Sequence, residues 1–245
     1  MTEAIFALGR GPELVGRTRY CDQPPEAAQV AIVGGFSDPS IEAIVALSPS
    51  LVCGERGPAG PDLPRRLGEH GIATYFPELD RVAQVEAMLV ELGERLDASA
   101  RGRELARALR AAIDEVAAGA PSSAKPRVVL LFDLDPLVAA SDDCFPGELL
   151  ALAGAENPVK GPSKYPRLGA EGLLALDPDV IIDASSMVRA ESARDPRVIV
   201  PGFAELRAVR KGRLRSLGST ASLRPGPRLG EGLRELARLV HGKPS

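Results

Sequence analysis

The feature that most constrains this chain is a long proline-free segment in its middle. Between residues 81 and 118 the only helix-weakening residues are Gly93 and Gly102. Apolar residues recur there in steps of three and four, which is typical of one face of a helix. The stripe consists of Val82, Val85, Leu89, Leu92, Leu96, Leu105, Leu109, Ile113 and Val116.

A single helix over 81–118 would be roughly 57 Å long, which exceeds the diameter of a small domain. The segment therefore predicts one helix that bridges two domains. Two alternatives stay open: a surface helix packed on one domain, or two helices broken between Asp97 and Gly102. The stretch 119–123 (GAPSS) marks the end of the helix.

Short apolar runs alternate with helical patterns on both sides of this segment. Strands that alternate with helices indicate parallel sheets covered on both faces. We therefore predict an α/β fold with a first lobe over 1–80, the helix over 81–118, and a second lobe over 124–245. The candidate strands are residues 30–33, 51–53, 73–76, 127–132, 180–182 and 213–217.

An internal repeat supports the two-lobed organisation. Residues 41–52 (IEAIVALSPSLV) match residues 170–181 (AEGLLALDPDVI), with Glu, Ala, Leu and Pro at the same offsets. Each copy predicts a short helix, a proline turn and a buried strand, which suggests duplicated lobes. Chance similarity between two helix–turn–strand units is the alternative.

Glu42 and Glu171 occupy the same position in the two copies. A carboxylate on the first turn of a helix is favoured by the helix dipole, and this alone accounts for both residues. The sharper hypothesis is that they are matched groups, one per lobe, that dock onto basic sockets of a symmetric partner.

Composition excludes several classes of protein. The formal net charge is −3 and no run of 18 apolar residues exists, which gives no support for nucleic-acid binding or membrane insertion. The three cysteines have no CxxC spacing, so no zinc or other metal site is predicted. P-loop, GxSxG, HExxH and post-strand GxGxxG motifs are missing, and the two histidines, His70 and His241, fit solvated helices.

Loops at strand ends are the candidate ligand-binding site. Ligands of parallel α/β sheets bind at the carboxyl ends of the strands, where glycine lets the backbone approach a ligand and aromatic rings supply flat apolar contact. Simple turn chemistry is the alternative for any single loop. The candidate cleft residues are Tyr20, Cys21, Asp22, Gly35, Phe36, Glu55, Arg56, Asp133, Asp142, Cys144, Phe145, Tyr165, Ser185, Ser186 and Met187.

At these residues the sequence resembles the class III periplasmic binding proteins, which include cobalamin-, siderophore- and haem-binding proteins. The similarity runs in order through nearly the whole chain. Its motifs are residues 2–9 (TEAIFALG), 14–24 (LVGRTRYCDQP), 33–35 (VGG), 145–157 (FPGELLALAGAEN), 165–167 (YPR) and 224–228 (RPGPR), together with the two repeats.

The resemblance implies two Rossmann-like lobes joined by one rigid helix, with a metal chelate held between them and no catalysis or cofactor. It also implies that Glu42 and Glu171 meet arginines on the two permease subunits of an ABC importer. Residues 18–22 (TRYCD) with Pro24 are most similar to the cobalamin-binding branch. We therefore expect a monomeric carrier of a corrinoid outside the cytoplasm.

The chain departs from the family pattern at three points. The usual first strand and any signal peptide are missing, so we expect that a leader has been removed or the start is truncated. Tryptophan is absent, so Tyr20, Phe36, Tyr75, Phe145 and Tyr165 would have to supply the aromatic contacts.

Three other functions stay open. The same fold could bind a ferric siderophore or haem, with Tyr20 or Tyr165 as axial ligand to the haem iron. An enzyme or cofactor-handling protein would need a titratable cluster, for which Asp133, Asp135, Asp142 and Asp143 are the candidates. A cytoplasmic protein with a sensing role is the third.

Overall fold

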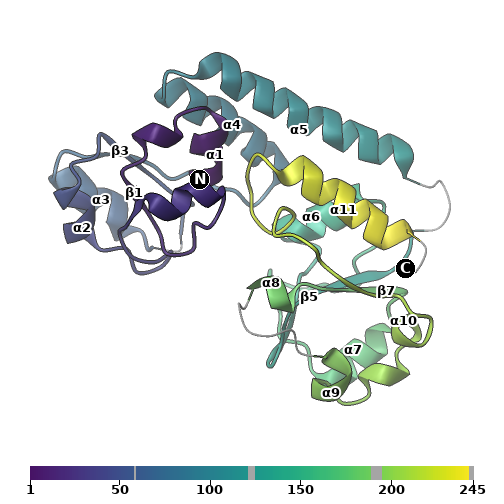
Figure 1. The fold of residues 1–245 in the computed structure, drawn as a ribbon. Coiled ribbons are helices and arrows are strands. Elements are labelled where there is room, and N and C mark those ends of the chain that lie inside the picture. Colours follow the sequence, from purple (N-terminus) through teal and green to yellow (C-terminus); the bar gives the residue numbers. More distant parts are fainter. Residues whose placement is uncertain (58, 121–124, 189–194, 243–245) are drawn as a thin grey trace. The chain divides into compact units, whose positions relative to one another are not determined.

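The chain forms two compact units, Met1–Ala108 (unit 1) and Leu109–Ser245 (unit 2). The computed structural model describes residues 1–57, 59–120, 125–188 and 195–242. Helix α5, Ser99–Gly119, contains the boundary between the units (Figure 1). The predicted α/β fold with mostly parallel sheets and a long helix is confirmed.

Unit 1 contains two small parallel sheets. Strand β1 (Gly16–Arg17) pairs with β2 (Ala31–Ile32), and β3 (Leu51–Cys53) pairs with β4 (Ala73–Tyr75). Helices α2 and α3 share an apolar cluster that includes Ile44 and Leu67. The helices of this unit are α1 (Thr2–Ala7), η1 (Gly11–Glu13), η2 (Pro25–Gln29), α2 (Ile41–Ala46), α3 (Asp62–Glu69) and α4 (Val82–Arg95).

Unit 2 is built on a four-stranded sheet with the order β6-β5-β7-β8. Strands β5 (Val128–Leu134), β7 (Val180–Asp183) and β8 (Leu214–Ser216) are parallel, and β6 (Leu137–Ala139) runs antiparallel to β5. Its helices are α6 (Phe145–Leu152), α7 (Ala170–Leu176), α8 (Ser185–Val188), α9 (Pro196–Ile199), η3 (Phe203–Glu205), α10 (Arg207–Arg210) and α11 (Leu229–His241).

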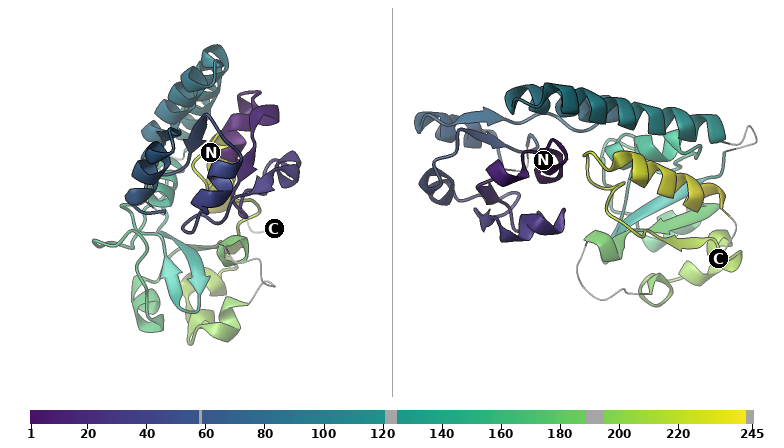
Figure 2. Two further views of the ribbon diagram at one scale, coloured as in Figure 1. Left: turned by 90° about the vertical axis from the view of Figure 1, so that its left-hand side faces the viewer. Right: turned by 45° about the horizontal axis from the view of Figure 1, so that its top comes forward.

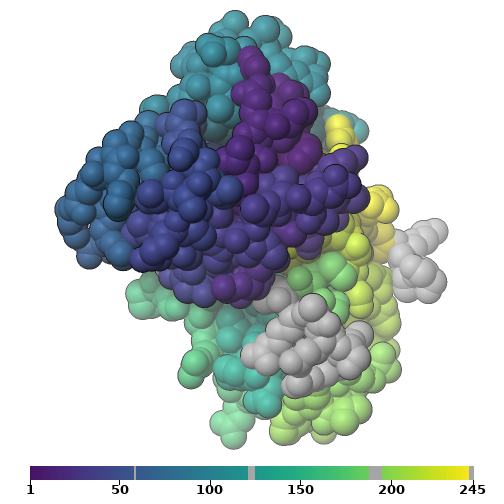
Figure 3. All heavy atoms as spheres, turned by 60° about the vertical axis from the view of Figure 1, so that its left-hand side comes forward, coloured from purple at the N-terminus to yellow at the C-terminus, as the bar shows by residue number. Residues whose placement is uncertain are grey.

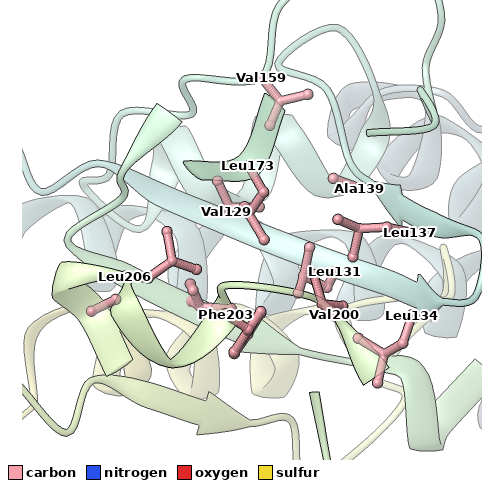
Figure 4. Close-up of a cluster of buried hydrophobic side chains, with 12 residues drawn as sticks. Val129, Leu131, Leu134, Leu137, Ala139, Val159, Leu173, Val200, Phe203 and Leu206 are labelled. Atoms are coloured by element: carbon pink, nitrogen blue, oxygen red, sulfur yellow. The ribbon is translucent and has the colours of Figure 1, made fainter. Parts of the chain in front are cut away.

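Helices cover both faces of this sheet. Figure 1 shows α6 and α11 on one face and α7, α9 and α10 on the other. Because successive strand residues point to opposite faces, Val129 and Leu131 project into the cluster around Leu173, Phe203 and other apolar residues (Figure 4). The result is a three-layer arrangement that leaves the carboxyl ends of the parallel strands to the loops.

Helix α11 packs along the C-terminal half of α5 (Figures 1 and 2). A Cβ added at Gly230 would lie 2.8 Å from the Ala112 Cβ, and the Arg234 guanidinium is hydrogen-bonded to Glu115 at 2.6 Å. The apolar stripe of α5 supplies the other side of this contact, since Leu109, Ile113 and Val116 are buried.

The prediction of a single helix over 81–118 was wrong. Two helices, α4 and α5, are separated by Leu96–Ala98, as the broken-helix alternative stated. Asp97 lies in the left-handed region with φ 52°, which no right-handed helix can pass through. The carbonyl of Asp97 accepts a hydrogen bond from Arg10, and Arg101 donates to the Ala7 carbonyl, so α1 is tied to this turn.

All six predicted strands are present with small shifts at their ends. Two strands were missed: β1 has two residues, and β6 follows β5 after the short turn at Asp135 and Pro136. The predicted stop of the long helix is right at Gly119, whereas residues 121–123 lie outside the described part of the chain.

Candidate ligand-binding site

Arg17, the last residue of β1, holds the loop that follows it. Its Nε donates to the Val30 carbonyl, Nη1 to the carbonyls of Thr18 and Cys21, and Nη2 to the carbonyl of Ala28, all at 3.1–3.2 Å. A guanidinium carries five N–H donors in a fixed planar arrangement. All four of these hydrogen bonds from Arg17 end on carbonyls of the segment 18–30, between β1 and β2. Arg17 therefore organises the loop that presents Tyr20 and Cys21.

Arg19 connects this loop to the loop after β2. Its Nη1 and Nη2 donate to the two carboxylate oxygens of Asp38 at 3.0 and 2.9 Å. This hydrogen-bonded pair lowers the pKa of the Asp38 carboxyl and raises that of Arg19. The Arg19 guanidinium also lies 5.7 Å from the centre of the Tyr20 ring.

Two aromatic side chains are exposed on these loops. Tyr20 is 60% and Phe36 49% exposed, and they follow β1 and β2, whose parallel pairing puts both carboxyl ends at one edge. Figure 3 turns the left-hand side of Figure 1 forward and shows the atoms of the early part of unit 1 in purple and dark blue. The structure thus places four of the predicted contact residues, Tyr20, Cys21, Gly35 and Phe36, on the two loops that follow β1 and β2.

Cys21 is half-buried beneath the loop. The Thr2 hydroxyl donates to its Sγ at 3.0 Å, and the Thr18 hydroxyl lies 3.2 Å from the same atom. Cys21, Cys53 and Cys144 are all free thiols. The hydroxyl contacts give Cys21 a role in joining α1 to the candidate loop.

Glu55 and Arg56 follow β3, in the second small sheet of unit 1. Arg56 donates from Nε to the Phe76 carbonyl and lies 3.6 Å from Glu78, with its side chain 66% exposed. Glu55 and Arg56 thus lie at the end of β3, on a different sheet from the one whose strands precede Tyr20 and Phe36.

Unit 2 places a second group of predicted residues at the ends of β5 and β7. Asp133 accepts hydrogen bonds from the backbone N–H groups of residues 134 and 135, and the buried Asp183 caps Ser185 at 2.9 Å. Ser185, Ser186 and Met187 form the start of α8 and are half-buried. Tyr165 is 45% exposed and meets Phe132 of β5 edge-on, with ring centres 5.1 Å apart.

Two predicted contact residues of unit 2 lie in its core instead. Cys144 is 1% and Phe145 6% exposed, because both begin α6, which packs onto the sheet. The Cys144 thiol donates to the Ser141 carbonyl. Asp142 is available at the surface and is paired with Lys160 at 2.7 Å.

Two of the four aspartates of the enzyme hypothesis, Asp133 and Asp142, are engaged in local structure. Asp133 serves backbone N–H groups and Asp142 pairs with Lys160. Within the described residues no group of three or more His, Cys, Asp or Glu side chains is arranged to hold a metal ion. His241 contacts the Ala153 carbonyl at 2.8 Å, and His70 ends α3.

Glu42 and Glu171 lie in matching surroundings. Each is exposed on the first turn of a short helix, and Ser48 and Asp177, at the same offset in each repeat, both have left-handed backbone with φ 47° and 35°. The pKa of Glu42 is lowered by its own backbone N–H and by the Ser40 hydroxyl. The repeat therefore extends to backbone conformation at a position where non-glycine residues are uncommon.

Three residues of this site were not predicted: Arg17, Arg19 and Asp38. Each lies within three positions of a predicted residue, yet arginine is common in this chain and nothing in the local pattern pairs Arg19 with a carboxylate nineteen positions away. The nearest signal was the short spacing of Arg17, Arg19 and Tyr20 directly after a strand.

Fold and site together define a two-unit α/β binding protein whose candidate contacts lie on loops at strand ends. The sequence profile described as periplasmic binding protein matches residues 1–221. The chain belongs to the periplasmic binding protein family. This family supplies the substrate-binding components of ABC transporters; its members work outside the cytoplasm with a permease and a small-molecule ligand, and are not enzymes.

Similar proteins carry several ligand names. The uncharacterized ABC transporter substrate-binding lipoprotein YvrC of Bacillus subtilis is 25% identical, over 98% of this chain and 77% of its own length. The vitamin B12-binding protein of Vibrio parahaemolyticus is 24% identical, over 93% of this chain and 81% of its own. The haem-binding protein BhuT, solved with two haems, is 28% identical with a TM-score of 0.85, over 98% of this chain and 95% of BhuT.

None of the helices in the described ranges is long and apolar enough to cross a membrane.

Proposed function

We propose that this protein is the substrate-binding component of an ABC importer and holds a metal chelate between its two units, with a corrinoid favoured. The observation that carries the proposal is the pair of exposed rings, Tyr20 and Phe36, at the carboxyl ends of two paired parallel strands. Large rigid macrocycles suit such a surface, because aromatic side chains give flat contact and little ordering entropy is lost.

The corrinoid is favoured over other chelates by the loop itself. Residues 18–22 with Pro24 are most similar to the cobalamin-binding branch, and a relative that spans most of the chain is named a vitamin B12-binding protein. Tyr165, an exposed aromatic side chain of unit 2, is proposed as a ligand contact from that unit.

Haem is the second candidate, because the chain exposes two tyrosines and resembles BhuT with its two haems. Haem iron takes a tyrosinate or histidine as axial ligand. Tyr20 and Tyr165 supply such groups, whereas His241 is engaged with a carbonyl. A ferric siderophore on the same fold is the remaining alternative.

Titration of the purified protein with cyanocobalamin, haemin and a ferric siderophore tests the proposal. Saturation at 100 times Kd should stabilise the protein by about 2.7 kcal/mol, visible as a thermal shift. The bound chelate should slow amide exchange both in residues 18–38 and in residues 183–187. Binding of none of the three would contradict the proposal, and protection confined to one unit would contradict a ligand held between them.

Tyr20→Phe separates the two leading ligands. The variant keeps the ring, so corrinoid affinity should change little, whereas a haem coordinated by Tyr20 would lose its axial ligand and its charge-transfer absorption. Tyr165→Phe is the matched variant on the other exposed tyrosine. A large loss of cyanocobalamin affinity in Tyr20→Phe would show that the hydroxyl, and not the ring, makes the contact.

The permease partner is proposed to engage Glu42 and Glu171, one from each unit. Both carboxylates are exposed, and Glu171 makes no ion pair among the residues that the structure describes. The protein is proposed to act as a monomer, because one copy presents both carboxylates.

A further inference from the structure

We propose that Arg19, Asp38 and Gly35 form a clip that holds the Tyr20 loop and the Phe36 loop as one preorganised surface, so that Arg19 and Asp38 are positioning residues for ligand affinity. This inference rests on the proposed function, because it names the residues that set the affinity of that site. We define the clip as these three residues.

The clip joins two loops that the chain separates. The Arg19 guanidinium makes two parallel hydrogen bonds to Asp38, at 3.0 and 2.9 Å. Its backbone N–H donates to the Gly34 carbonyl at 3.0 Å, so the side chain and the backbone of Arg19 both reach the second loop. A bidentate arginine–carboxylate pair fixes orientation as well as distance.

Asp38 is itself held in place by its backbone. The Gly35 N–H donates to the Asp38 carbonyl at 3.2 Å, and Ser40 N–H donates to the Val33 carbonyl at 2.8 Å. The loop of residues 34–39 is thereby closed on itself, with Phe36 at its tip. The carboxylate of Asp38 therefore has a defined position toward which Arg19 points.

Gly35 leaves the space that the side chains of Arg19 and Asp38 occupy. A Cβ at position 35 would lie 2.0 Å from the Asp38 Oδ1 and 2.2 Å from the Arg19 Nη1, closer than any real Cβ contact. Both neighbours are side-chain ends, so a larger residue would fit only by pushing the two charged groups apart. The Arg19–Asp38 ion pair therefore lies directly against the backbone at Gly35.

Arg19 also connects the clip to the aromatic surface. Its guanidinium lies 5.7 Å from the Tyr20 ring centre while Asp38 neutralises its charge. The ring is 60% exposed and free to make ligand contact, yet its neighbour on the chain is fixed to the second loop. Rigid presentation of a contact residue raises affinity by lowering the ordering cost of binding.

The expected effect on the free energy of unfolding separates a positioning role of the clip in ligand binding from a role in global stability. An exposed ion pair contributes little to folding, and the side chains of Arg19 and Asp38 are 44% and 62% exposed. Arg234 and Glu115 form a matched pair in unit 2, with 46% and 61% exposure and two hydrogen bonds. Loss of either pair should affect global stability equally, and only loss of the clip should affect the loops.

The test compares Arg19→Met, Asp38→Asn and Gly35→Ala with the control variants Arg234→Met and Glu115→Gln. The first readout is amide exchange of the unliganded protein over residues 18–38. The second is Kd for cyanocobalamin and for haemin. We expect each clip variant to accelerate exchange in both loops and raise Kd about three- to tenfold, with thermal midpoints like those of the controls.

The double variant Arg19→Met/Asp38→Asn should weaken binding no more than either single variant, since both remove one interaction. Unchanged exchange in residues 18–38, or an equal rise of Kd in the Arg234 and Glu115 variants, would overturn the clip. If the wild-type protein binds none of cyanocobalamin, haemin and the ferric siderophore, the proposed function fails, and the exchange of the unliganded loops still decides whether the clip exists.

Discussion

At the scale of single residues, the site depends on arginines that serve the protein's own chain. Arg17 gives its donors to four backbone carbonyls of one loop, and Arg19 gives its fork to one carboxylate of the next. The hydrogen bonds of Arg17 hold the loop after β1 in place, because this loop has few backbone hydrogen bonds of its own. Those of Arg19 set the relative position of two loops.

Substitution of Arg17 should destabilise unit 1. Arg17→Met leaves three part-buried carbonyls and one exposed carbonyl without their donor, and we expect a loss of about 1–3 kcal/mol in the free energy of unfolding. Arg17→Lys should recover only part of it, because an ammonium lacks the planar fork. Urea unfolding measures both; Arg56→Met, whose side chain is largely exposed, is the control and should change stability by less than about 0.5 kcal/mol.

The ionisation of Asp38 should report the clip directly. Its pKa is lowered by the hydrogen bond from Arg19, so the ion pair is present above the ordinary value of 3.8 and is lost as pH falls through the lowered pKa. In an NMR titration of the Asp38 carboxyl, Arg19→Met should therefore move the midpoint upward toward 3.8. A midpoint that is the same in both proteins would mean that the pair does not form in solution.

At the scale of elements, Gly93 and Gly102 allow helices α4 and α5 to pack closely against each other. A Cβ at Gly102 of α5 would lie 2.6 Å from the Leu89 carbonyl oxygen and 3.2 Å from the Gly93 Cα of α4. The helices approach through backbone, next to the turn at Asp97. By contrast, a Cβ built at Gly172 of α7 would have no atom within 4 Å.

The same substitution should therefore have opposite effects at these two positions. Gly102→Ala should destabilise the protein by about 1–3 kcal/mol, because backbone atoms of α4 must move. Gly172→Ala should stabilise it by about 0.5–1 kcal/mol, because alanine loses less entropy in a helix. Thermal and urea unfolding give both values, and a neutral Gly102→Ala would mean that α4 and α5 do not pack this closely.

At the scale of the whole molecule, the duplicated helix–turn–strand unit gives each half one exposed carboxylate. The repeats share a buried residue two positions after the glutamate, Ile44 and Leu173, and a left-handed residue before the proline. The same local structure thus orients Glu42 and Glu171 in their separate units. A partner with two related subunits would recognise such a pair.

Charge reversal tests this recognition. Glu42→Arg and Glu171→Arg should each lower uptake through the permease about tenfold or more, and the double variant should abolish it, because a like charge then faces each socket. Kd for the chelate should not change. Glu231→Arg, on the first turn of α11, is the matched control. A change of Kd in the reversed proteins would instead put the two glutamates in the binding site.

How much of this was predictable differs between fold and site. The six strands, the amphipathic stripe and the repeat follow from periodicity and turn residues, which act over a few positions. Tyr20, Cys21, Gly35 and Phe36 were each predicted as ligand contacts, but their meeting at one edge was not, because it depends on the pairing of β2 with β1, a strand that the sequence pattern missed. The burial of Cys144 and Phe145 was not, because it depends on how α6 packs onto the sheet.

The sequence by itself determined the α/β class, six of the strands, the internal repeat and the family, since these depend on patterns along the chain. Only the tertiary structure decided the break at Asp97, the antiparallel β6, and the contacts of Arg17 and Arg19. The reason is physical: the sequence offers an arginine many possible carbonyl and carboxylate acceptors. Only the folded backbone places one set of these oxygens where the planar guanidinium can donate to them.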